Sequence, residues 1–568
     1  MPPVRPGSRR SFRDIFGGER VHILKIGLTV LIHAAALGLM VWSESTAVGK
    51  AAYLLAWGWL NCLWLALLRR PAAAAGISLA MVAILILLSQ LKHHVLLMTV
   101  NFIDLMVIDP DSFAFLMSVM PGLARNAALA AVVALPVFVL LWWVDPLRVR
   151  LRAAFLGGTT CFAVLAALSF AVPHDREEEF WDENYVSKFA LSGATALTEL
   201  LVNGLMDADS AVAERLSAAR AEGCQPQQKP PHIIMILDES SFDASAVAGV
   251  KVPAGYQRHF LSLDGATRTF TVEGAGGPTW YTEYNVLTGL SARSFGKFAE
   301  FVTRIAAGRV ERGLPQALRR CGYQTFSLYP WMGAFLSARS FQTAIGIDRF
   351  LDAKDLGAEG AEPDHFYFDA ATRLIAGERA RGPLFVLVYT MANHFPWTYR
   401  FRPDRMTEWR DPGNGFEVDE YLRRQAMSAE DYAHLRARLA REFPGERFLI
   451  VRFGDHQPLF AKHLIDPSLS DGELGRRIAA FDPSYFTTYY AIDAVNFTPV
   501  DLSLAIDKLD APYLPLVVLE AAGVPLDPSF AEQKKILERC RGLFYRCAGG
   551  AEARRFNRLL IDAGLIKG

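Results

Sequence analysis

Five apolar stretches in the first third of the chain limit its fold more than any other feature, because each approaches or reaches the length that crosses a lipid bilayer. A membrane-spanning helix needs about 20 predominantly apolar residues, with a range of roughly 17 to 25. They predict an α-helical membrane domain of five transmembrane helices within residues 1–173, and the rest of the 568-residue chain is long enough for a separate soluble domain. The five stretches cover residues 26–42, 51–68, 72–91, 127–144 and 153–172.

Basic residues flank these stretches unevenly, and their distribution predicts the topology. Lys and Arg gather before the first stretch, between the second and third, and between the fourth and fifth. By the positive-inside rule the N-terminus is then cytoplasmic, and everything after Val172 lies outside. The basic residues in question are Arg5, Arg9, Arg10, Arg13, Arg20, Lys25, Arg69, Arg70, Arg148, Arg150 and Arg152.

The charges argue against two classes of function. Lys plus Arg and Asp plus Glu both number 59, so no overall basic field indicates a nucleic-acid partner. A transporter or channel should carry charged residues or broken helices inside its spans. The predicted spans hold almost none, with His33 as the main exception, so a transport function is disfavoured.

The cysteines divide between the two predicted parts of the chain. Two lie within spans, where they act as small apolar residues. Four lie in the part predicted to be outside, where disulfides persist. Two of these four are close enough in sequence to pair with each other, although sequence alone does not fix the connectivity. The span cysteines are Cys62 and Cys161, and the outer ones are Cys224, Cys321 and the close pair Cys540 and Cys547.

Three further segments complete the organisation of the chain. Residues 92–123 join two predicted spans on the outer side, and their mixed composition favours either an amphipathic segment in the membrane interface or an ordinary loop. Residues 174–231 start with an acidic run and end in a Pro- and Gln-rich stretch, which indicates a connector. In residues 232–568, strand-like runs alternate with helical stretches, which predicts an extracytoplasmic α/β domain.

Three apolar runs in this α/β domain end in polar residues. Each run is typical of a short buried strand, and parallel sheets place their chemistry at the carboxyl ends of strands. Carboxylate and imidazole groups gathered at one edge would suit a divalent metal ion. The runs are 232–237, followed by Asp238-Glu239-Ser240; 384–389, followed by Thr390-Met391-Ala392-Asn393-His394; and 448–453, followed by Gly454-Asp455-His456.

A glycine-rich turn precedes a further candidate. Gly274-Ala275-Gly276-Gly277-Pro278 leads into Thr279 at the start of a predicted helix, where backbone N–H groups favour an anion such as phosphate. Thr279 could be a nucleophile whose proton is removed with the help of a metal ion. The alternative is a plain helix N-cap, which is a common role for threonine.

In this order the motifs resemble the lipoteichoic acid synthase-type phosphoglycerol transferases, within the alkaline phosphatase and sulfatase superfamily, over most of the chain. In that family a Glu after the first strand is a metal ligand; Glu239 matches it, with Asp238 where the family has Leu. The Gly-Asp-His metal motif of the family matches Asp455 and His456. Its nucleophile, a Thr after a glycine-rich turn, matches Thr279.

Other matches concern the substrate. Glu283 follows the predicted nucleophile at the family spacing, which implies a place in substrate binding. His394 matches the Asn-His-x-Pro motif and is implied to bind phosphate oxygens or to protonate the leaving group. Arg339 is the residue implied to contact the phosphoglycerol group, although Leu336 stands near the place of a family Trp.

The resemblance implies a fold and a reaction. The outer domain should be an alkaline phosphatase/sulfatase-like sandwich on the periplasmic or extracellular side of a bacterial inner membrane. A divalent metal, manganese or magnesium with zinc also open, would be bound by Glu239, Thr279, Asp455 and His456. Thr279 would take the head group of phosphatidylglycerol through a phosphothreonine-linked intermediate and pass it to a glycan or lipid acceptor.

Three alternatives stay open to different degrees. A phosphoethanolamine transferase shares the superfamily and the membrane plan. A sulfatase would need Cys or Ser at position 279, so Thr279 argues against it. A catalytically silent membrane protein with a partner-binding outer domain is also conceivable, and bound metal would distinguish it from an enzyme. Two other histidines could lie near the site, namely His365 and His463.

Overall fold

The computed structural model describes residues 18–96, 99–106, 122–144, 149–172, 182–202, 204–216, 224 and 229–567. Within these residues the chain forms two compact units, one running to Thr198 and the other starting at Glu199. The predicted domain boundaries at 173/174 and 231/232 stay predictions.

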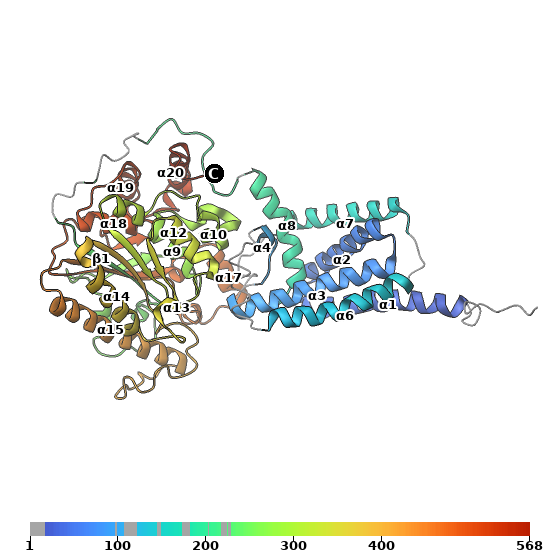
Figure 1. The fold of residues 1–568 in the computed structure, drawn as a ribbon, viewed down its shortest axis with the longest axis horizontal. Helices are drawn as coiled ribbons and strands as arrows, with labels where there is room; N and C mark the ends of the chain where they lie inside the picture. Colours follow the sequence, from blue (N-terminus) through green and yellow to red (C-terminus); the bar gives the residue numbers. More distant parts are fainter. Residues whose placement is uncertain are drawn as a thin grey trace, which may run out of the picture. The chain divides into compact units, whose positions relative to one another are not determined.

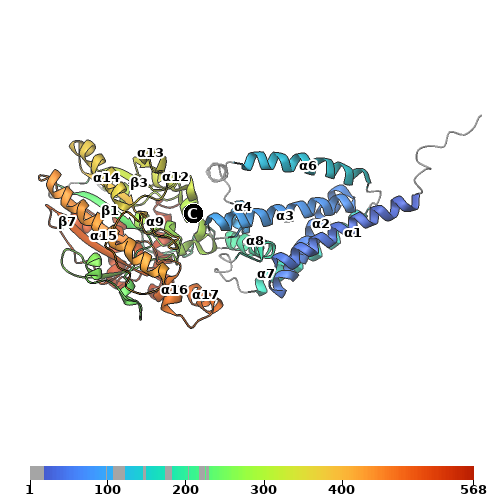
Figure 2. The same cartoon turned by 90° about the horizontal axis from the view of Figure 1, so that it is seen from below.

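The first unit is made of helices, which Figure 1 and Figure 2 show from two directions. Four of them are long and apolar enough to cross a membrane, over Ile26–Ser43, Ala47–Leu68, Pro71–His93 and Leu151–Ala171. The predicted span over 127–144 falls on α6, which is not among these four, so five spans stay a prediction. The helices are α1 (Gly18–Ser43), α2 (Ala47–Leu68), α3 (Pro71–Leu96), α4 (Phe102–Met106), α6 (Leu123–Val144), α7 (Leu151–Ala171) and α8 (Tyr185–Val202).

Small residues let α2 and α7 pack closely. A Cβ atom added to Gly58 would lie 2.9 Å from the Cys161 Sγ, and one added to Gly157 would lie 3.0 Å from the Cys62 Sγ. Close helix packing through such small residues is typical of membrane bundles. Both cysteines have free thiols and fill the space between the helices, as their apolar surroundings predicted.

Two predicted linking segments lie partly outside the described residues. The segment 92–123 contains the end of α3, the short helix α4 and the first residue of α6, and residues 107–121 of it are not among those described. The predicted connector 174–231 contains α8, and its acidic start up to residue 181 is likewise outside.

The second unit is built on one eight-stranded sheet in the order β4-β3-β5-β1-β6-β7-β2-β8. β5, β1 and β6 are adjacent and parallel, and they confirm the three strands predicted from the apolar runs. The strands are β1 (His232–Asp238), β2 (Arg268–Thr271), β3 (Gln324–Leu328), β4 (Arg349–Leu351), β5 (Leu384–Tyr389), β6 (Phe448–Gly454), β7 (Thr487–Val495) and β8 (Lys508–Asp510).

Helices cover both faces of this sheet. α14 and α15 lie on one side, and α9, α12 and α18 lie on the other (Figure 1). Because all residues of β1, β5 and β6 are buried, these strands read as continuous apolar runs rather than alternating ones. The helices are α9 (Thr279–Thr288), α10 (Val302–Ala306), α11 (Leu314–Arg320), α12 (Ala338–Ala344), α13 (Ala353–Leu356), α14 (Asp364–Glu378), α15 (Phe416–Glu442), α16 (Ala461–Ile465), α17 (Asp471–Ala479), α18 (Leu514–Ala522), α19 (Pro528–Cys540) and α20 (Ala551–Asp562).

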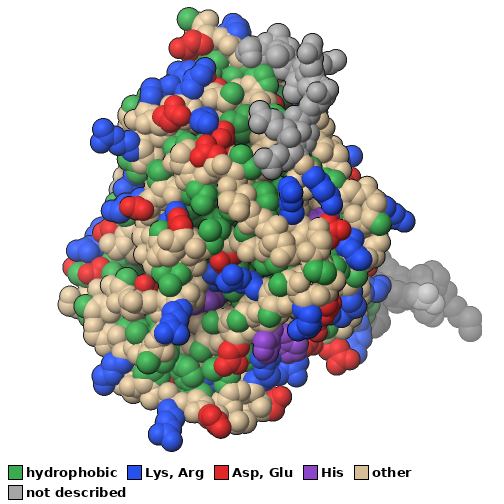
Figure 3. Space-filling view, turned by 90° about the vertical axis from the view of Figure 1, so that its left-hand side faces the viewer, with side chains coloured by type: hydrophobic (Ala, Val, Ile, Leu, Met, Phe, Trp, Pro, Cys, Tyr) green, Lys and Arg blue, Asp and Glu red, His purple; other side chains and the backbone are tan. Residues whose placement is uncertain are grey.

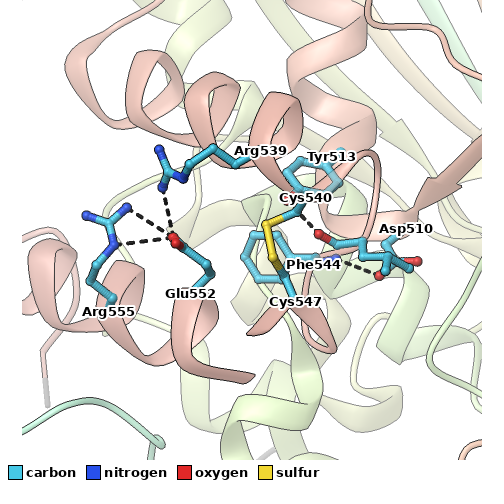
Figure 4. The surroundings of a disulfide bond; sticks show 9 residues. Asp510, Tyr513, Arg539, Cys540, Phe544, Cys547, Glu552 and Arg555 are labelled. Atoms are coloured by element: carbon cyan, nitrogen blue, oxygen red, sulfur yellow. Dashed lines mark hydrogen bonds and ion pairs between the residues drawn. A yellow bond between two sulfur atoms is a disulfide. The ribbon is translucent and has the colours of Figure 1, made fainter. Parts of the chain in front are cut away.

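Two disulfides hold this unit. Cys540 pairs with Cys547 between α19 and α20 (Figure 4), as their short spacing allowed. Beside this bond, Glu552 accepts from Arg539 at 2.8 Å, which ties the same two helices together. The second disulfide joins Cys224 to Cys321. Disulfides persist in oxidising compartments, which agrees with the predicted outer location.

The surface of this unit has a mixed charge. On the face that Figure 3 shows, Lys and Arg side chains are interspersed with Asp and Glu side chains and with hydrophobic ones. This agrees with the equal numbers of the two charge types in the whole chain, 59 each.

Candidate active site

The polar residues predicted to follow the strands leave the sheet at one edge. In the parallel pair of β1 and β6, Asp238 lies opposite Gly454. Glu239 and Asp455 are therefore the next residues of two neighbouring strands, and both emerge at the carboxyl edge where parallel sheets carry their sites. β5, on the other side of β1, brings the segment with His394 to the same edge.

Glu239, Asp455 and His456 form a buried group that could bind a metal ion. Each offers one ligand atom, and these atoms all lie within 4.8 Å of one another. The His456 Nε2 is 3.7 Å from the Glu239 Oε1 and 3.3 Å from the Asp455 Oδ2. Ligand atoms at about 2.0–2.2 Å from a common ion stand roughly 3–4 Å apart, so the spacing of this group fits such an ion.

The electrostatics of the group also favour a cation. Burial and the neighbouring Asp455 carboxylate raise the pKa of Glu239, so ionising both acids without a counter-charge is unfavourable. One Asp455 oxygen accepts from the Ser240 N–H at 2.8 Å. The other is buried and has no hydrogen-bond partner in the described part of the chain. A divalent cation would compensate both carboxylates and provide a partner for that oxygen.

His456 is oriented as a metal ligand would be. Its Nδ1 lies 2.8 Å from the Gln457 carbonyl oxygen. Because a carbonyl only accepts, Nδ1 carries a proton, and Nε2 is the ring nitrogen that faces the acidic group as a candidate ligand atom. The Thr279 Oγ1 lies 3.3 Å from this Nε2. The threonine hydroxyl therefore stands beside the three candidate ligands.

Gly454 lets the two strand ends come this close. A Cβ atom at this position would lie 1.8 Å from the Ser241 carbonyl oxygen, so no side chain fits there. The backbone around Gly454 is held by two threonines. The Thr488 hydroxyl donates to the Gly454 carbonyl at 2.8 Å, and the Thr282 hydroxyl donates to the Asp455 carbonyl at 2.7 Å.

Thr279 is the first residue of α9, and Pro278 occupies the N-cap position without a side-chain capping hydrogen bond. The alternative of an ordinary threonine N-cap is therefore wrong. The hydroxyl is directed to His456 instead of to the helix backbone, which leaves it available for chemistry.

A pocket adjoins Thr279. Its walls are mainly apolar with a few polar groups, as is typical of small-molecule sites. One wall residue, Leu336, has a left-handed backbone with φ 45°, and its carbonyl accepts from the Thr303 hydroxyl at 2.8 Å. A left-handed bulky residue costs energy and is found at functional sites more often than elsewhere. The lining residues are Thr279, Trp280, Glu283, Thr303, Tyr329, Phe335, Leu336 and Ala338.

Glu283 is the one acidic residue among those lining residues. Its Oε1 accepts from the Gln342 Nε2 at 2.9 Å, and the same nitrogen donates to the Tyr389 hydroxyl at 2.8 Å. Burial raises the pKa of Glu283 to about 7. Its neighbours are thus neutral donors, and near neutral pH the carboxyl is present in both protonation states.

The Nε2 of His394 is available for acid–base catalysis. Its Nδ1 lies 2.8 Å from the Phe395 carbonyl oxygen, so this nitrogen carries the proton and Nε2 holds the lone pair. The ring stacks on that of Phe395, with centroids 4.4 Å apart. Burial lowers the pKa of His394, partly opposed by the negative charge of Asp455. The imidazole is therefore neutral at pH 7.

Arg339 has other partners. Its guanidinium donates to Asp352 at 2.6 Å, to Asp355 at 3.1 Å and to the Phe350 carbonyl at 2.9 Å. It is not among the residues that line the pocket, although Ala338 next to it is. Its predicted contact with the phosphoglycerol group stays a prediction.

The two other histidines lie outside the metal-binding group. The His365 Nδ1 is 2.6 Å from Arg405, which in turn pairs with Asp431 at 2.7 Å. His463 lies on α16. Neither is among the pocket-lining residues.

Sequence reasoning missed most of the pocket. Tyr329 follows β3 directly, so the strand-end rule applied to this shorter run could have indicated it. Phe335 and Gln342 had no local signal, because their position depends on how the segment after β3 folds back against α9.

The comparisons agree with this geometry. The sulfatase family model matches residues 234–473. This region is therefore similar to the sulfatase family. It contains Glu239, Thr279, Asp455 and His456.

Individual relatives are distant. The capsular polysaccharide biosynthesis protein RkpI of Rhizobium meliloti (strain 1021) is 28% identical over 253 residues, which cover 42% of this chain and 43% of that protein. The matched region is thus less than half the length of the relative.

Two solved structures illustrate the range of similar folds. The Streptococcus pyogenes phosphoglycerol transferase GacH, in complex with sn-glycerol-1-phosphate, is 14% identical with a TM-score of 0.45 and covers 60% of this chain and 86% of its own. The lipooligosaccharide phosphoethanolamine transferase EptA of Neisseria meningitidis is 11% identical with a TM-score of 0.38 and covers 85% and 96%. These likenesses do not discriminate between the two head groups.

Proposed function

We propose that the protein is a membrane-bound, metal-dependent transferase that moves a phosphoglycerol head group from phosphatidylglycerol to a glycan or lipid acceptor. The observation that carries the proposal is the position of the Thr279 hydroxyl, 3.3 Å from the Nε2 of His456 and beside the carboxylates of Glu239 and Asp455. A nucleophile, two acids and an imidazole at one sheet edge suit phosphoryl transfer.

These residues fit a divalent cation. Glu239, Asp455, His456 and the Thr279 oxygen would bind it, and manganese, magnesium and zinc all accept such oxygen and nitrogen ligands. When bound, the ion would make the threonine hydroxyl more acidic and offset the negative charge of the phosphate.

In the first step the Thr279 oxygen attacks the phosphorus of the donor lipid. The bond from phosphorus to the diacylglycerol oxygen breaks, and the proton lost by the Thr279 hydroxyl passes through the His394 Nε2 to that oxygen, so diacylglycerol leaves as the free alcohol. Glycerol phosphate remains esterified to Thr279. In the second step an acceptor hydroxyl attacks the same phosphorus, the Thr279 oxygen leaves, and the neutral His394 takes the acceptor proton at Nε2. The protonated His394 then gives this proton to the Thr279 oxygen, so both residues return to their starting protonation states.

Glu283 favours a second candidate, phosphoethanolamine transfer. A buried carboxylate with only neutral donors around it would gain from the ammonium group of ethanolamine. Arg339, which would repel that ammonium, is already paired with Asp352 and Asp355. In the phosphoglycerol case the partly protonated Glu283 would hydrogen-bond the glycerol hydroxyls instead.

A donor assay decides between these candidates. We expect the purified protein with Mn²⁺ to release diacylglycerol from labelled phosphatidylglycerol at least about 10-fold faster than from phosphatidylethanolamine, a difference of about 1.4 kcal/mol in transition-state binding. Chelation should stop the release, and added Mn²⁺ should restore it. Release from phosphatidylethanolamine alone would favour the second candidate, and release from neither lipid would contradict head-group transfer.

The proposal requires the α/β unit to lie outside the cytoplasm. We expect a Glu359→Cys variant, altered at an exposed position, to react with a membrane-impermeant maleimide on intact cells. Arg69→Cys, at a predicted cytoplasmic loop, should react only after lysis. The reverse labelling pattern would place the site in the cytoplasm and would remove phospholipids of the outer leaflet as donors.

A further inference from the structure

The segment 390–399 carries His394 away from the end of β5 and contains no helix or strand. Residues Thr390 to Asn393 are buried, so their backbone groups cannot all turn to water. Buried N–H and C=O groups need partners. Here side chains from two helices provide them, one from each side of the segment.

Arg424 binds the carbonyl groups. Its Nη1 donates to the His394 carbonyl at 2.8 Å, and its Nη2 donates to the carbonyls of Pro396 at 2.9 Å and Tyr399 at 3.1 Å. The Arg424 side chain is only 1% exposed. Burying a guanidinium is costly unless its donors are used. These three bonds, and a longer one of 3.5 Å from Nη1 to the Ala392 carbonyl, all go to the segment that holds the candidate acid–base residue.

Asp364 binds N–H groups of the same segment. One of its oxygens accepts from the Met391 N–H at 3.1 Å and from the Ala392 N–H at 3.0 Å. Asp364 is the first residue of α14, whereas Arg424 lies on α15. Asp364 therefore holds the backbone before His394, whereas Arg424 binds mainly the carbonyls of His394 and of residues after it, with one longer bond to Ala392 before it.

The neighbouring Arg423 pairs with the same acid, Glu420, but donates to different backbone carbonyls. Glu420 accepts from the Arg424 Nε at 2.8 Å and from the Arg423 Nε at 2.9 Å. Arg423 donates to the carbonyls of Phe401 and Arg405, which lie beyond the segment. The chain thus offers a matched control, a second buried arginine on the same acid whose backbone acceptors, Phe401 and Arg405, lie outside residues 390–399.

We propose that Arg424 and Asp364 are positioning residues, which fix the backbone on both sides of His394 and thereby hold its imidazole at the reacting groups. Arg424 suits this task because its planar fork reaches several carbonyls in fixed directions, whereas a lysine ammonium is a single point charge on a flexible stem. The part that concerns catalysis rests on the proposed function, in which His394 takes the acceptor proton.

The test compares Arg424→Lys with Arg423→Lys in the full-length protein, using diacylglycerol release and transfer to an acceptor as the assay. We expect Arg424→Lys to lower kcat at least about 10-fold with KM changed less than about 2-fold, because a misplaced acid–base group affects the transition state and not ground-state binding. Arg423→Lys should change kcat less than about 3-fold.

A double-mutant comparison shows whether the effect passes through His394. In a His394→Ala background, Arg424→Lys should lower kcat less than about 3-fold further, because the group that it positions is already absent. The same 10-fold loss in both backgrounds, or equal losses for the two arginine variants, would overturn the proposal.

Hydrogen exchange gives a readout that needs no activity. Amides within 390–399 should exchange faster in Arg424→Lys than in the wild type, while Arg423→Lys leaves them unchanged. Unchanged exchange in Arg424→Lys would overturn the proposal even if no donor lipid is cleaved, whereas an inactive wild type alone would count only against the proposed function. If Arg424→Lys does not fold, Asp364→Ala tests the same segment from the other side, with the same expected exchange and the same dependence on His394.

Discussion

Replacing Thr279 by alanine is expected to reduce head-group transfer at least about 10³-fold, because the proposed mechanism forms its covalent intermediate on this hydroxyl and on no other group. The loss should leave folding nearly intact. Thr279 makes no capping bond at the start of α9, so its removal should change the free energy of unfolding by less than about 1 kcal/mol. Diacylglycerol release and thermal unfolding of the purified variant measure the two effects.

Thr288→Ala is the matched control for this prediction. Thr288 lies at the other end of α9, and its hydroxyl donates to the Tyr284 carbonyl within the same helix. We expect this variant to retain transfer within a few fold, roughly in line with an ordinary helix hydroxyl. Mass spectrometry should find head-group phosphate attached to a peptide with Thr279 in the wild type and not in Thr279→Ala. Near-normal turnover by Thr279→Ala would contradict covalent catalysis at this residue.

Local patterns predicted the centre of the sheet and the edge of the site. The runs at 232–237, 384–389 and 448–453 are mostly apolar, apart from His232 and Arg452, because β1, β5 and β6 are buried on both faces. Polar residues can follow such strands only where the sheet ends. This rule alone is enough to predict that Glu239 and Asp455 lie at the same edge of the sheet.

Features that depend on packing between distant segments could not be predicted in this way. The pocket beside Thr279 needs Tyr329 and Leu336, which reach it because β3 pairs with β5. The left-handed backbone of Leu336 has no signal in its residue type. The ion pair of Arg339 with Asp352 likewise depends on how the segment after β3 folds back, so a motif match could name the arginine but not its partners.

In the membrane domain, too, some helices could be predicted from composition alone, whereas another depends on tertiary packing. Apolar length was enough to predict the four helices that could cross a bilayer. The span predicted over 127–144 stays a prediction, because α6 is described only in part. This helix contains Pro136. A proline in a membrane helix is tolerated when neighbouring groups satisfy the freed carbonyl, and that depends on tertiary packing.

Gly454→Ala is expected to destabilise the α/β unit by about 3 kcal/mol, at the upper end for an overpacked core. The added Cβ would lie 1.8 Å from the Ser241 carbonyl oxygen, and a backbone atom cannot rotate away as a side chain can. Either β6 or the turn after β1 must shift. Because Asp455 and His456 follow Gly454 directly, we expect metal affinity to fall together with stability.

Gly445→Ala distinguishes this steric effect from a general cost of replacing glycine. Gly445 lies in the turn before β6, and an added Cβ there meets no atom within 4 Å. Its free energy of unfolding should change by less than about 0.5 kcal/mol. Urea unfolding of both variants, with metal content measured on the same samples, tests the prediction. The contradicting result is a Gly454→Ala protein that is as stable as Gly445→Ala and still binds metal. The ends of β1 and β6 would then be farther apart than the 1.8 Å between the added Cβ and the Ser241 carbonyl oxygen implies. The proposed metal-binding group at this edge of the sheet would lose its structural basis.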